Sequence, residues 1–337
     1  MRFFVYLLMV LAGFAFFVYK QETPTSEVRT QTSPVENVKA STSPTEPNSA
    51  ASTTPEKPKP TIKTPPPIDP QTLQLIQQKI GEASKSLENL KTVDTPPVPR
   101  VKLSQQELYN KAQTRIVNFF CQEGGQVRTA SGIIISPKGY ILTNAHVTEG
   151  FDSNFECLIR QGSPARNLGY AKPVMFPQTY AQATQKEQQL KNDAAIWKLT
   201  RGPGDPPGLP LPNSFPYYEI DPNFYPEIGQ PLVTFSYPAE LLGYETLLKS
   251  LNMLFGEATV SQMDQNFILS STSLSSQAGS SGGIMVDVYT GEMVGLIFAV
   301  SQEKQINQRN LLSLNNNSIN RIVQTEIGLS LQNFLNQ

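Results

Sequence analysis

The chain has 337 residues, of which 16% are charged, and its 27 Lys and Arg against 28 Asp and Glu give a formal net charge of −1. This balance argues against a protein that binds nucleic acid by neutralising phosphates, because such proteins carry a concentrated basic surface. One His and two Cys are too few for a structural zinc site of Cys and His ligands, or for a small scaffold held by disulfides. We therefore expect no metal, no cofactor and no nucleic-acid partner.

An uncharged apolar run occupies residues 3–19 (FFVYLLMVLAGFAFFVY), between Arg2 and Lys20. Its length is at the lower limit for a helix that spans a bilayer, about 17–25 residues. A cleaved signal peptide is the alternative, with Gly13 and Ala15 as small residues near the cleavage site, but the apolar run continues beyond them. We predict a single-pass signal-anchor over residues 1–20. Both interpretations place the rest of the chain outside the cytoplasm, in a periplasm or at the cell surface.

The next segments resemble a stalk. Residues 21–70 contain 11 prolines among many Thr and Ser, and such a composition predicts a disordered linker because it buries too little apolar surface. Residues 71–92 carry an apolar stripe at helical spacing, which predicts a short amphipathic helix. It either packs on its own domain or supports weak self-association through residues 71–91. Residues 93–103, rich in proline, form a second linker. The stripe consists of Leu73, Ile76, Ile80, Ala83, Leu87 and Leu90.

The folded domain is predicted to span residues 104–337. Ser104 and Glu107 have the spacing of a capping box, which predicts a short helix through Ala112. Short apolar runs separated by Gly, Pro and Asp then favour an all-β sandwich or barrel architecture, and the length suits two small barrels. The runs are Arg115–Cys121, Gly132–Ser136, Tyr140–Thr143, Phe155–Ile159, Ala194–Leu199, Pro231–Ser236, Leu251–Val260, Phe267–Thr272, Gly283–Val288 and Met293–Val300.

Three other stretches of this domain have their own character. Residues 160–192 are predicted to be a long, partly helical connection with a Gln- and Lys-rich stretch. Residues 201–229 contain eight prolines and are predicted to be an extended crossing between two halves of the domain. A C-terminal helix is predicted from Ile319 to Leu335.

A serine between glycines is the candidate nucleophile. Gly279-Ser280-Ser281-Gly282-Gly283 fits the pattern G-x-S-x-G, in which glycines permit the sharp turn that exposes a hydroxyl and let N–H groups approach an oxyanion. The motif alone is weak, because Gly- and Ser-rich loops are common turns. The sole histidine of the chain, His146, strengthens it, since a serine needs a base to accept its proton.

The order of the residues along the chain selects among the known layouts of serine nucleophiles. No His follows Ser281, as an α/β-hydrolase would require, and the Asp residues that precede His146 lie in proline-rich linkers. The order His, Asp, Ser of the chymotrypsin layout remains. Among the Asp residues between His146 and Ser281, Asp193 is the best candidate, because it opens an apolar strand (NDAAIWKL).

Three separated segments of this chain resemble the trypsin-like serine peptidases with the chymotrypsin fold, most closely the bacterial HtrA-type protease domain. They are SGIIISPKGYILTNAHV (131–147), NDAAIWKL (192–199) and AGSSGG (278–283), the last followed by VDVYTGEMVGLIF (286–298). The resemblance implies two six-stranded antiparallel β-barrels with a triad of His146, Asp193 and Ser281 in the cleft between them. It also implies an oxyanion hole formed by the N–H groups of Gly279 and Ser281.

The same resemblance implies how a substrate binds. Ser275 is expected at the base of the primary specificity pocket, where an uncharged residue disfavours Lys and Arg, and the strand with Ile297, Phe298 and Ala299 is expected to pair with the substrate backbone. Two features depart from relatives. The chain ends 56 residues after Ser281, so we expect no PDZ domain, and Ser280 replaces the Asp that trypsinogen-type activation needs.

Two cysteines, Cys121 and Cys157, are predicted on strands that flank the His146 segment, where they form either a disulfide or two separate buried thiols. Taken together, the sequence predicts a membrane-tethered serine endopeptidase that cleaves peptide bonds of extracytoplasmic proteins through an acyl-enzyme. The alternative is a catalytically inactive trypsin-like fold that acts as a surface binding module. The partners are then protein or peptide substrates and the membrane.

Overall fold

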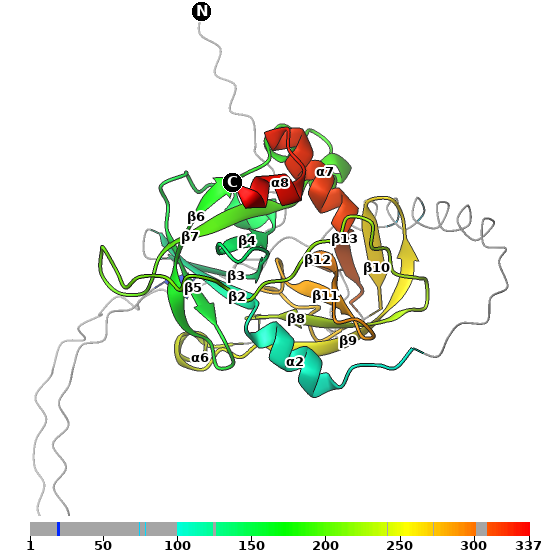
Figure 1. Ribbon diagram of the computed structural model, residues 1–337, viewed down its shortest axis with the longest axis horizontal. Helices are drawn as coiled ribbons and strands as arrows, with labels where there is room; N and C mark the ends of the chain where they lie inside the picture. The colour runs from blue at the N-terminus through cyan, green and yellow to red at the C-terminus, as the bar shows by residue number, and fades with distance from the viewer. Residues whose placement is uncertain are drawn as a thin grey trace, which may run out of the picture.

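The computed structural model describes residues 100–123, 126–240, 242–271, 273–300 and 309–337, together with residues 19–20, 74 and 78. Two antiparallel barrels, each of six strands, lie next to each other, and helices border their junction (Figure 1). This confirms the two six-stranded barrels expected from the sequence. The stretch from residue 202 to residue 230, which links the barrels, contains no helix or strand.

The first barrel follows the order β3-β2-β5-β6-β7-β4, and an additional pairing of β3 with β4 closes it. Short helices lie in its connections: α3 (Ala145–Thr148), α4 (Gln178–Ala181) and α5 (Lys186–Lys191). The strands are β2 (Ile116–Glu123), β3 (Gln126–Ile134), β4 (Tyr140–Thr143), β5 (Cys157–Gln161), β6 (Arg166–Met175) and β7 (Ala195–Arg201).

The second barrel closes in the order β10-β13-β12-β11-β8-β9. One short helix, α6 (Tyr244–Lys249), lies between β8 and β9. The strands are β8 (Pro231–Ser236), β9 (Leu254–Met263), β10 (Phe267–Ser270), β11 (Ile284–Asp287), β12 (Met293–Val300) and β13 (Leu311–Asn315).

Each barrel has an apolar interior, and a larger cluster joins them. The interior of the first barrel is built around Phe119 and Trp197, whose rings meet edge to face with centroids 5.2 Å apart. The interior of the second barrel includes Ile268 and Met285. The joining cluster contains residues of both barrels and of the helices at their junction. Burial of this apolar surface from both sides fixes the barrels against each other.

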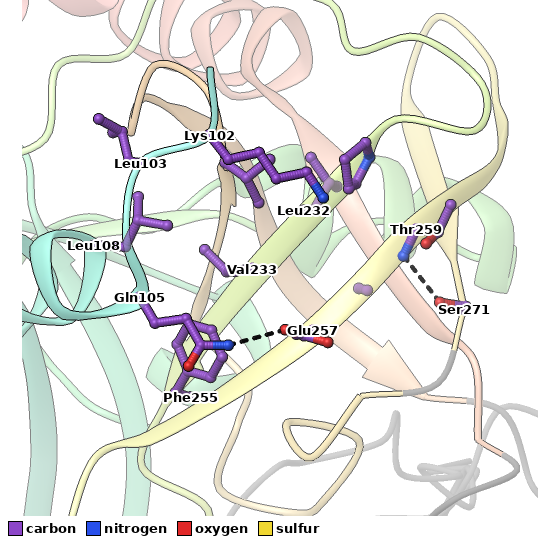
Figure 2. Close-up of a pocket in the computed structure, with 13 residues that line it drawn as sticks. Lys102, Leu103, Gln105, Leu108, Leu232, Val233, Phe255, Glu257, Thr259 and Ser271 are labelled. Atoms are coloured by element: carbon purple, nitrogen blue, oxygen red, sulfur yellow. Dashed lines mark hydrogen bonds between the residues drawn. The ribbon is translucent and has the colours of Figure 1, made fainter. Parts of the chain in front are cut away.

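The helix α2 (Gln105–Gln113) precedes the first barrel and begins as the sequence predicted. The Ser104 hydroxyl accepts a hydrogen bond from Glu107 N at 3.2 Å, and the Glu107 carboxylate accepts one from Ser104 N at 2.8 Å. The chain around the start of α2 crosses β8 and β9 and leaves a cavity of about 330 Å³ (Figure 2). Gln105 reaches across it to Glu257 at 3.1 Å. None of the predicted site residues lines this cavity.

The predicted C-terminal helix is confirmed, but it is not continuous over residues 319–335: the structure divides it into α7 (Asn316–Ile327) and α8 (Leu331–Asn336). Gly328 ends α7 with a φ of 78°, a left-handed conformation that favours glycine. The Ser330 hydroxyl then caps α8. Figure 1 shows both helices across one side of the junction between the barrels. Their bend brings Phe334 within 5.5 Å of the Tyr140 ring, measured between centroids.

Two strands escaped the sequence prediction. Residues 160–192 do contain the helices α4 and α5, but they also contain β6, only three of whose ten residues are buried. Its pairing with β7 shifts register twice, and it includes Pro173, so the sequence shows no clean alternation. The other missed strand, β13, is buried throughout and is followed at once by α7, so no turn residue marks its end.

The predictions for the N-terminal part lie almost entirely outside the described residues. Within the part that the structure describes, no helix is long and apolar enough to be a membrane span. Tyr19 and Lys20, at the end of the predicted signal-anchor, form the short strand β1 (Tyr19–Lys20), which pairs with β3. From the stalk and the predicted helix over residues 71–92, only Gln74 and Gln78 are described, and both are helical and exposed.

Candidate active site

His146 lies on α3, directly after β4 has delivered the chain to one end of the first barrel. Only 3% of the residue is exposed. Trp197, the only tryptophan of the chain, anchors this helix. Its Nε1 donates a hydrogen bond to Thr148 Oγ1 at 2.8 Å. A strand and a buried indole therefore position the imidazole, although α3 itself has a single turn.

Asp193 lies at the end of the loop that leads into β7 and faces the same helix. Its Oδ2 is 2.7 Å from His146 Nδ1, and its Oδ1 accepts a hydrogen bond from the His146 backbone N at 2.9 Å. The Asn144 side chain donates to the Asp193 carbonyl at 2.9 Å, which fixes the backbone of the aspartate. Asp193 is 2% exposed. Both carboxylate oxygens thus hold one histidine, which selects the tautomer with its proton on Nδ1.

The other ring nitrogen of the histidine stays available. His146 Nε2 is buried and has no hydrogen-bond partner among the described residues, Ser281 Oγ included. With the proton on Nδ1, Nε2 is a lone-pair acceptor. Catalytic hydrogen bonds of free enzymes are often long and shorten when a substrate binds. The histidine is therefore oriented on one side and open on the other.

A second carboxylate lies close to this pair. Glu149 follows α3, its side chain hydrogen-bonds the buried Tyr180, and it interacts electrostatically with His146, Asp193 and Lys186. Burial raises the pKa of Glu149, Asp193 adds to the rise, and His146, Lys186 and Tyr180 oppose it without cancelling it. No sequence motif marks Glu149, because its interactions with Asp193, Tyr180 and Lys186 arise only when the chain is folded.

The loop of residues 279–283 brings Ser281 from the second barrel against the first. The Ser281 carbonyl accepts a hydrogen bond from Ser131 N at 2.8 Å, and Thr143 Oγ1 donates to the Ser131 carbonyl at 2.8 Å. Thr143 lies three residues before His146, so β3 and β4 connect the two segments. A Cβ atom on Gly282 would overlap the Ser131 carbonyl, so only glycine allows this approach.

The backbone around Ser281 is held so that two N–H groups remain unused. The carbonyls of Ala278 and Ser280 accept hydrogen bonds from Ala239 N at 2.9 Å and Gly283 N at 2.8 Å. In a trans peptide the N–H points away from the C=O, so the N–H groups of Gly279 and Ser281 point away from these partners. Neither donates to a backbone carbonyl of the described residues. Both are free to bind an oxyanion.

Ser275, expected at the base of the specificity pocket, is fully buried in a network of hydroxyl groups. Its Oγ accepts hydrogen bonds from Thr234 Oγ1 at 2.9 Å and Ser236 Oγ at 3.0 Å. Ser280 Oγ, next to the candidate nucleophile, lies 3.0 Å from the same Ser236 Oγ. The network contains no charged group.

The strand expected to pair with a substrate is β12. Ile297 already uses both backbone groups, because its N donates to Gly283 O at 2.8 Å and its O accepts from Gly282 N at 2.9 Å. The Ile297 N–H is therefore occupied, while its carbonyl oxygen has a second lone pair. Phe298 and Ala299 lie beyond this pairing, at a register shift in the pairing of β12 with β13.

Cys121 and Cys157, which lie on β2 and β5, form a disulfide. The bond closes a sequence separation of 36 residues and joins strands that also carry the apolar interior of the first barrel. Among the described residues no group of three or more His, Cys, Asp or Glu side chains is arranged to hold a metal ion.

One family model and several solved structures are similar to parts of this chain. Residues 130–296 match the model of the trypsin-like peptidase domain. The chain is similar to the crystal structure of the serine endoprotease from Yersinia pestis, with 21% identity over 69% of this chain and 68% of that one and a TM-score of 0.48. It is also similar to the HtrA-type protease AlgW with tripeptide, with 17% identity over 67% and 65% of the two chains and a TM-score of 0.47. No curated protein sequence matches it.

Proposed function

We propose that this chain is a serine endopeptidase, because residues 130–296 match the model of the trypsin-like peptidase domain. In this proposal it cleaves proteins with Ser281 as nucleophile, His146 as general base and Asp193 as orienting carboxylate. The observation that carries this assignment is the buried contact of 2.7 Å between His146 Nδ1 and Asp193 Oδ2, with Nε2 unpartnered. A histidine held in this way accepts a proton at Nε2 and nowhere else.

The reaction then proceeds in two acyl-transfer steps. Ser281 Oγ attacks the carbonyl carbon of the peptide bond while its proton moves to His146 Nε2, and Asp193 stabilises the resulting imidazolium. The N–H groups of Gly279 and Ser281 stabilise the oxyanion of the tetrahedral intermediate. The imidazolium returns the proton to the departing amine, which leaves an acyl-enzyme on Ser281. Water, deprotonated by the same histidine, hydrolyses the ester and regenerates the hydroxyl.

The specificity pocket favours an uncharged side chain. The hydroxyl network around Ser275 supports this, because it provides no carboxylate to pair with a Lys or Arg of the substrate. The network is polar and internally hydrogen-bonded, so a cationic side chain would remain without a counter-ion.

The enzyme acts outside the cytoplasm, tethered by the apolar run at residues 3–19. The disulfide between Cys121 and Cys157 supports this location, because disulfides persist in oxidising compartments. Fractionation of the full chain, compared with a form lacking residues 1–20, tests the tether. Recovery of the full chain in the soluble fraction after alkaline carbonate would contradict it.

A fluorophosphonate probe tests the catalytic assignment, because it reacts only with an activated serine. The wild-type chain should be labelled and Ser281→Ala should not. Ser280→Ala is the matched control, since it removes the neighbouring hydroxyl and should leave labelling intact. Asp193→Asn should reduce turnover of fluorescent casein about 10⁴-fold. A wild-type chain that folds but takes no label would instead favour an inactive trypsin-like fold that serves as a binding module.

A further inference from the structure

An ion pair of the second barrel lies directly behind the loop that carries Ser281. Glu240 belongs to the connection after β8, and Arg309 precedes β13. Arg309 Nη1 and Nη2 donate to the two carboxylate oxygens of Glu240 at 2.8 and 3.0 Å. The two side chains are only 14% and 16% exposed. Such a bidentate, largely buried pair has a fixed geometry as well as a charge.

Both members of the pair also bind the backbone just before the oxyanion hole. Glu240 Oε2 accepts a hydrogen bond from Ala278 N at 3.0 Å, and Arg309 Nη1 donates to the Ser276 carbonyl at 3.1 Å. Ser276 Oγ donates in return to the Arg309 carbonyl at 2.8 Å. The residue next to Glu240, Ala239, donates its N–H to the Ala278 carbonyl at 2.9 Å. Residues 276–278 are thus held from two sides.

The Ala278 carbonyl is the far end of the peptide bond whose N–H belongs to Gly279. Because Ala278 is bound at both its N–H and its carbonyl, that peptide has little freedom to rotate, and the Gly279 N–H keeps its direction. The side chain of Ser280, which precedes Ser281, makes a neutral contact with Ser236 Oγ. Ser280 therefore offers no charged side chain that could order the loop.

We propose that Glu240 and Arg309 are positioning residues, which act through Ala278 to hold the Gly279 N–H in the orientation that stabilises the oxyanion. The proposal rests on the catalytic function proposed above. In this proposal the ion pair orders the oxyanion hole, a role for which the uncharged side chain of Ser280 is unsuited. Glu240 remains ionised in this role: burial acts to raise its pKa, but the hydrogen bonds from Arg309 and Ala278 N outweigh burial and lower the pKa overall.

The test uses the full chain and the kinetics of fluorophosphonate labelling, because the phosphonyl oxygen of the adduct occupies the oxyanion hole. In Glu240→Ala the maximal labelling rate should fall at least about tenfold, since loss of one oxyanion donor typically costs 10²–10³. The probe concentration at half-maximal rate should stay within about threefold, because the pair acts on the backbone of residues 276–278. Glu240→Gln should fall less, because its amide oxygen still accepts from Ala278 N.

A second ion pair provides the matched control. Arg201 binds Glu156 in the first barrel, with Nη2 2.9 Å from Oε2 and comparable exposure, but neither residue contacts the Ser281 loop. Glu156→Gln should therefore label at the wild-type rate. Circular dichroism shows whether each variant is folded. Should Glu240→Ala fail to fold, Glu240→Gln and Arg309→Lys carry the test, both with rates below that of Glu156→Gln.

Two results would overturn the proposal. One is a folded Glu240 or Arg309 variant that labels within about twofold of wild type; the other is a loss of rate that Glu156→Gln shares. In either case wild-type labelling would leave the proposed function standing. A folded wild-type chain that takes no label would remove the proposed function and this inference with it.

Discussion

Substitution of Gly282 by alanine tests the closest approach between the two barrels. Gly282 has a φ of 82°, and a Cβ there would overlap the Ser131 carbonyl and lie 2.5 Å from Thr143 Oγ1. The left-handed conformation costs alanine about 1–2 kcal/mol. The overlap involves buried backbone that cannot move away, which adds about 1–3 kcal/mol. Gly282→Ala should therefore lower the free energy of unfolding by about 2–5 kcal/mol, a large part of the roughly 5–15 kcal/mol of a typical domain.

Gly229 separates the two contributions. Its φ is 81°, nearly the same, but a Cβ there would meet no atom within 4 Å. Gly229→Ala should therefore cost only the conformational term of about 1–2 kcal/mol. Both variants are measured by urea unfolding followed by Trp197 fluorescence. Equal destabilisation by the two substitutions would refute the close packing of the Ser281 loop on β3, and with it the way in which the two barrels form one site.

Two further predictions concern the first barrel. Because the pKa of Glu149 is raised, chiefly by burial, its contribution to stability is present below the unfolded pKa and is lost as pH rises through the folded pKa. Glu149→Gln should thus melt at a higher temperature than wild type at pH 8, and a melting difference that grows toward pH 4 would contradict this. Replacement of Cys121 and Cys157 by serine should lower the free energy of unfolding by about 2–4 kcal/mol. Loss of the disulfide without any change in the denaturation midpoint would argue against that estimate.

The barrels could be predicted because most strands are short apolar runs bounded by turn residues. The ten predicted runs cover ten of the twelve barrel strands in whole or in part. The two exceptions, β6 and β13, lack the local signal. Only three of the ten residues of β6 are buried and its pairing is irregular, and β13 runs directly into α7 with no turn between them. Each of these strands forms because two neighbouring strands of its barrel pair with it, β5 and β7 for β6, and β10 and β12 for β13. This is an effect of tertiary structure and not of local sequence. The division of the C-terminal helix at Gly328 depends on the left-handed backbone conformation of that glycine, which the structure gives and the sequence does not.

The candidate site divides in the same way. His146, Asp193 and Ser281 follow from residue type and chain order, and the structure brings His146 and Asp193 together. Which groups surround them does not follow from order. Glu240 and Arg309 are 69 residues apart in the sequence, and neither lies in a motif. Ser131 begins the segment 131–147 that resembles the peptidases. Its N–H donates to the Ser281 carbonyl and its hydroxyl to the Gly279 carbonyl, and both hydrogen bonds depend on the contact between the barrels.

The two halves of the site are held with unequal strength, and this decides where activity can change independently of folding. His146 and Asp193 lie in connections of one barrel and each is at most 3% exposed, and α3, which carries His146, is bound to the buried Trp197 through Thr148. The Ser281 loop instead depends on a few polar contacts from outside its own strand: Ser131 in the first barrel, and Ala239, Glu240 and Arg309 in the second. Polar contacts of this kind each contribute about 0.5–3 kcal/mol. Loss of one can therefore misplace an oxyanion donor while both barrels stay folded.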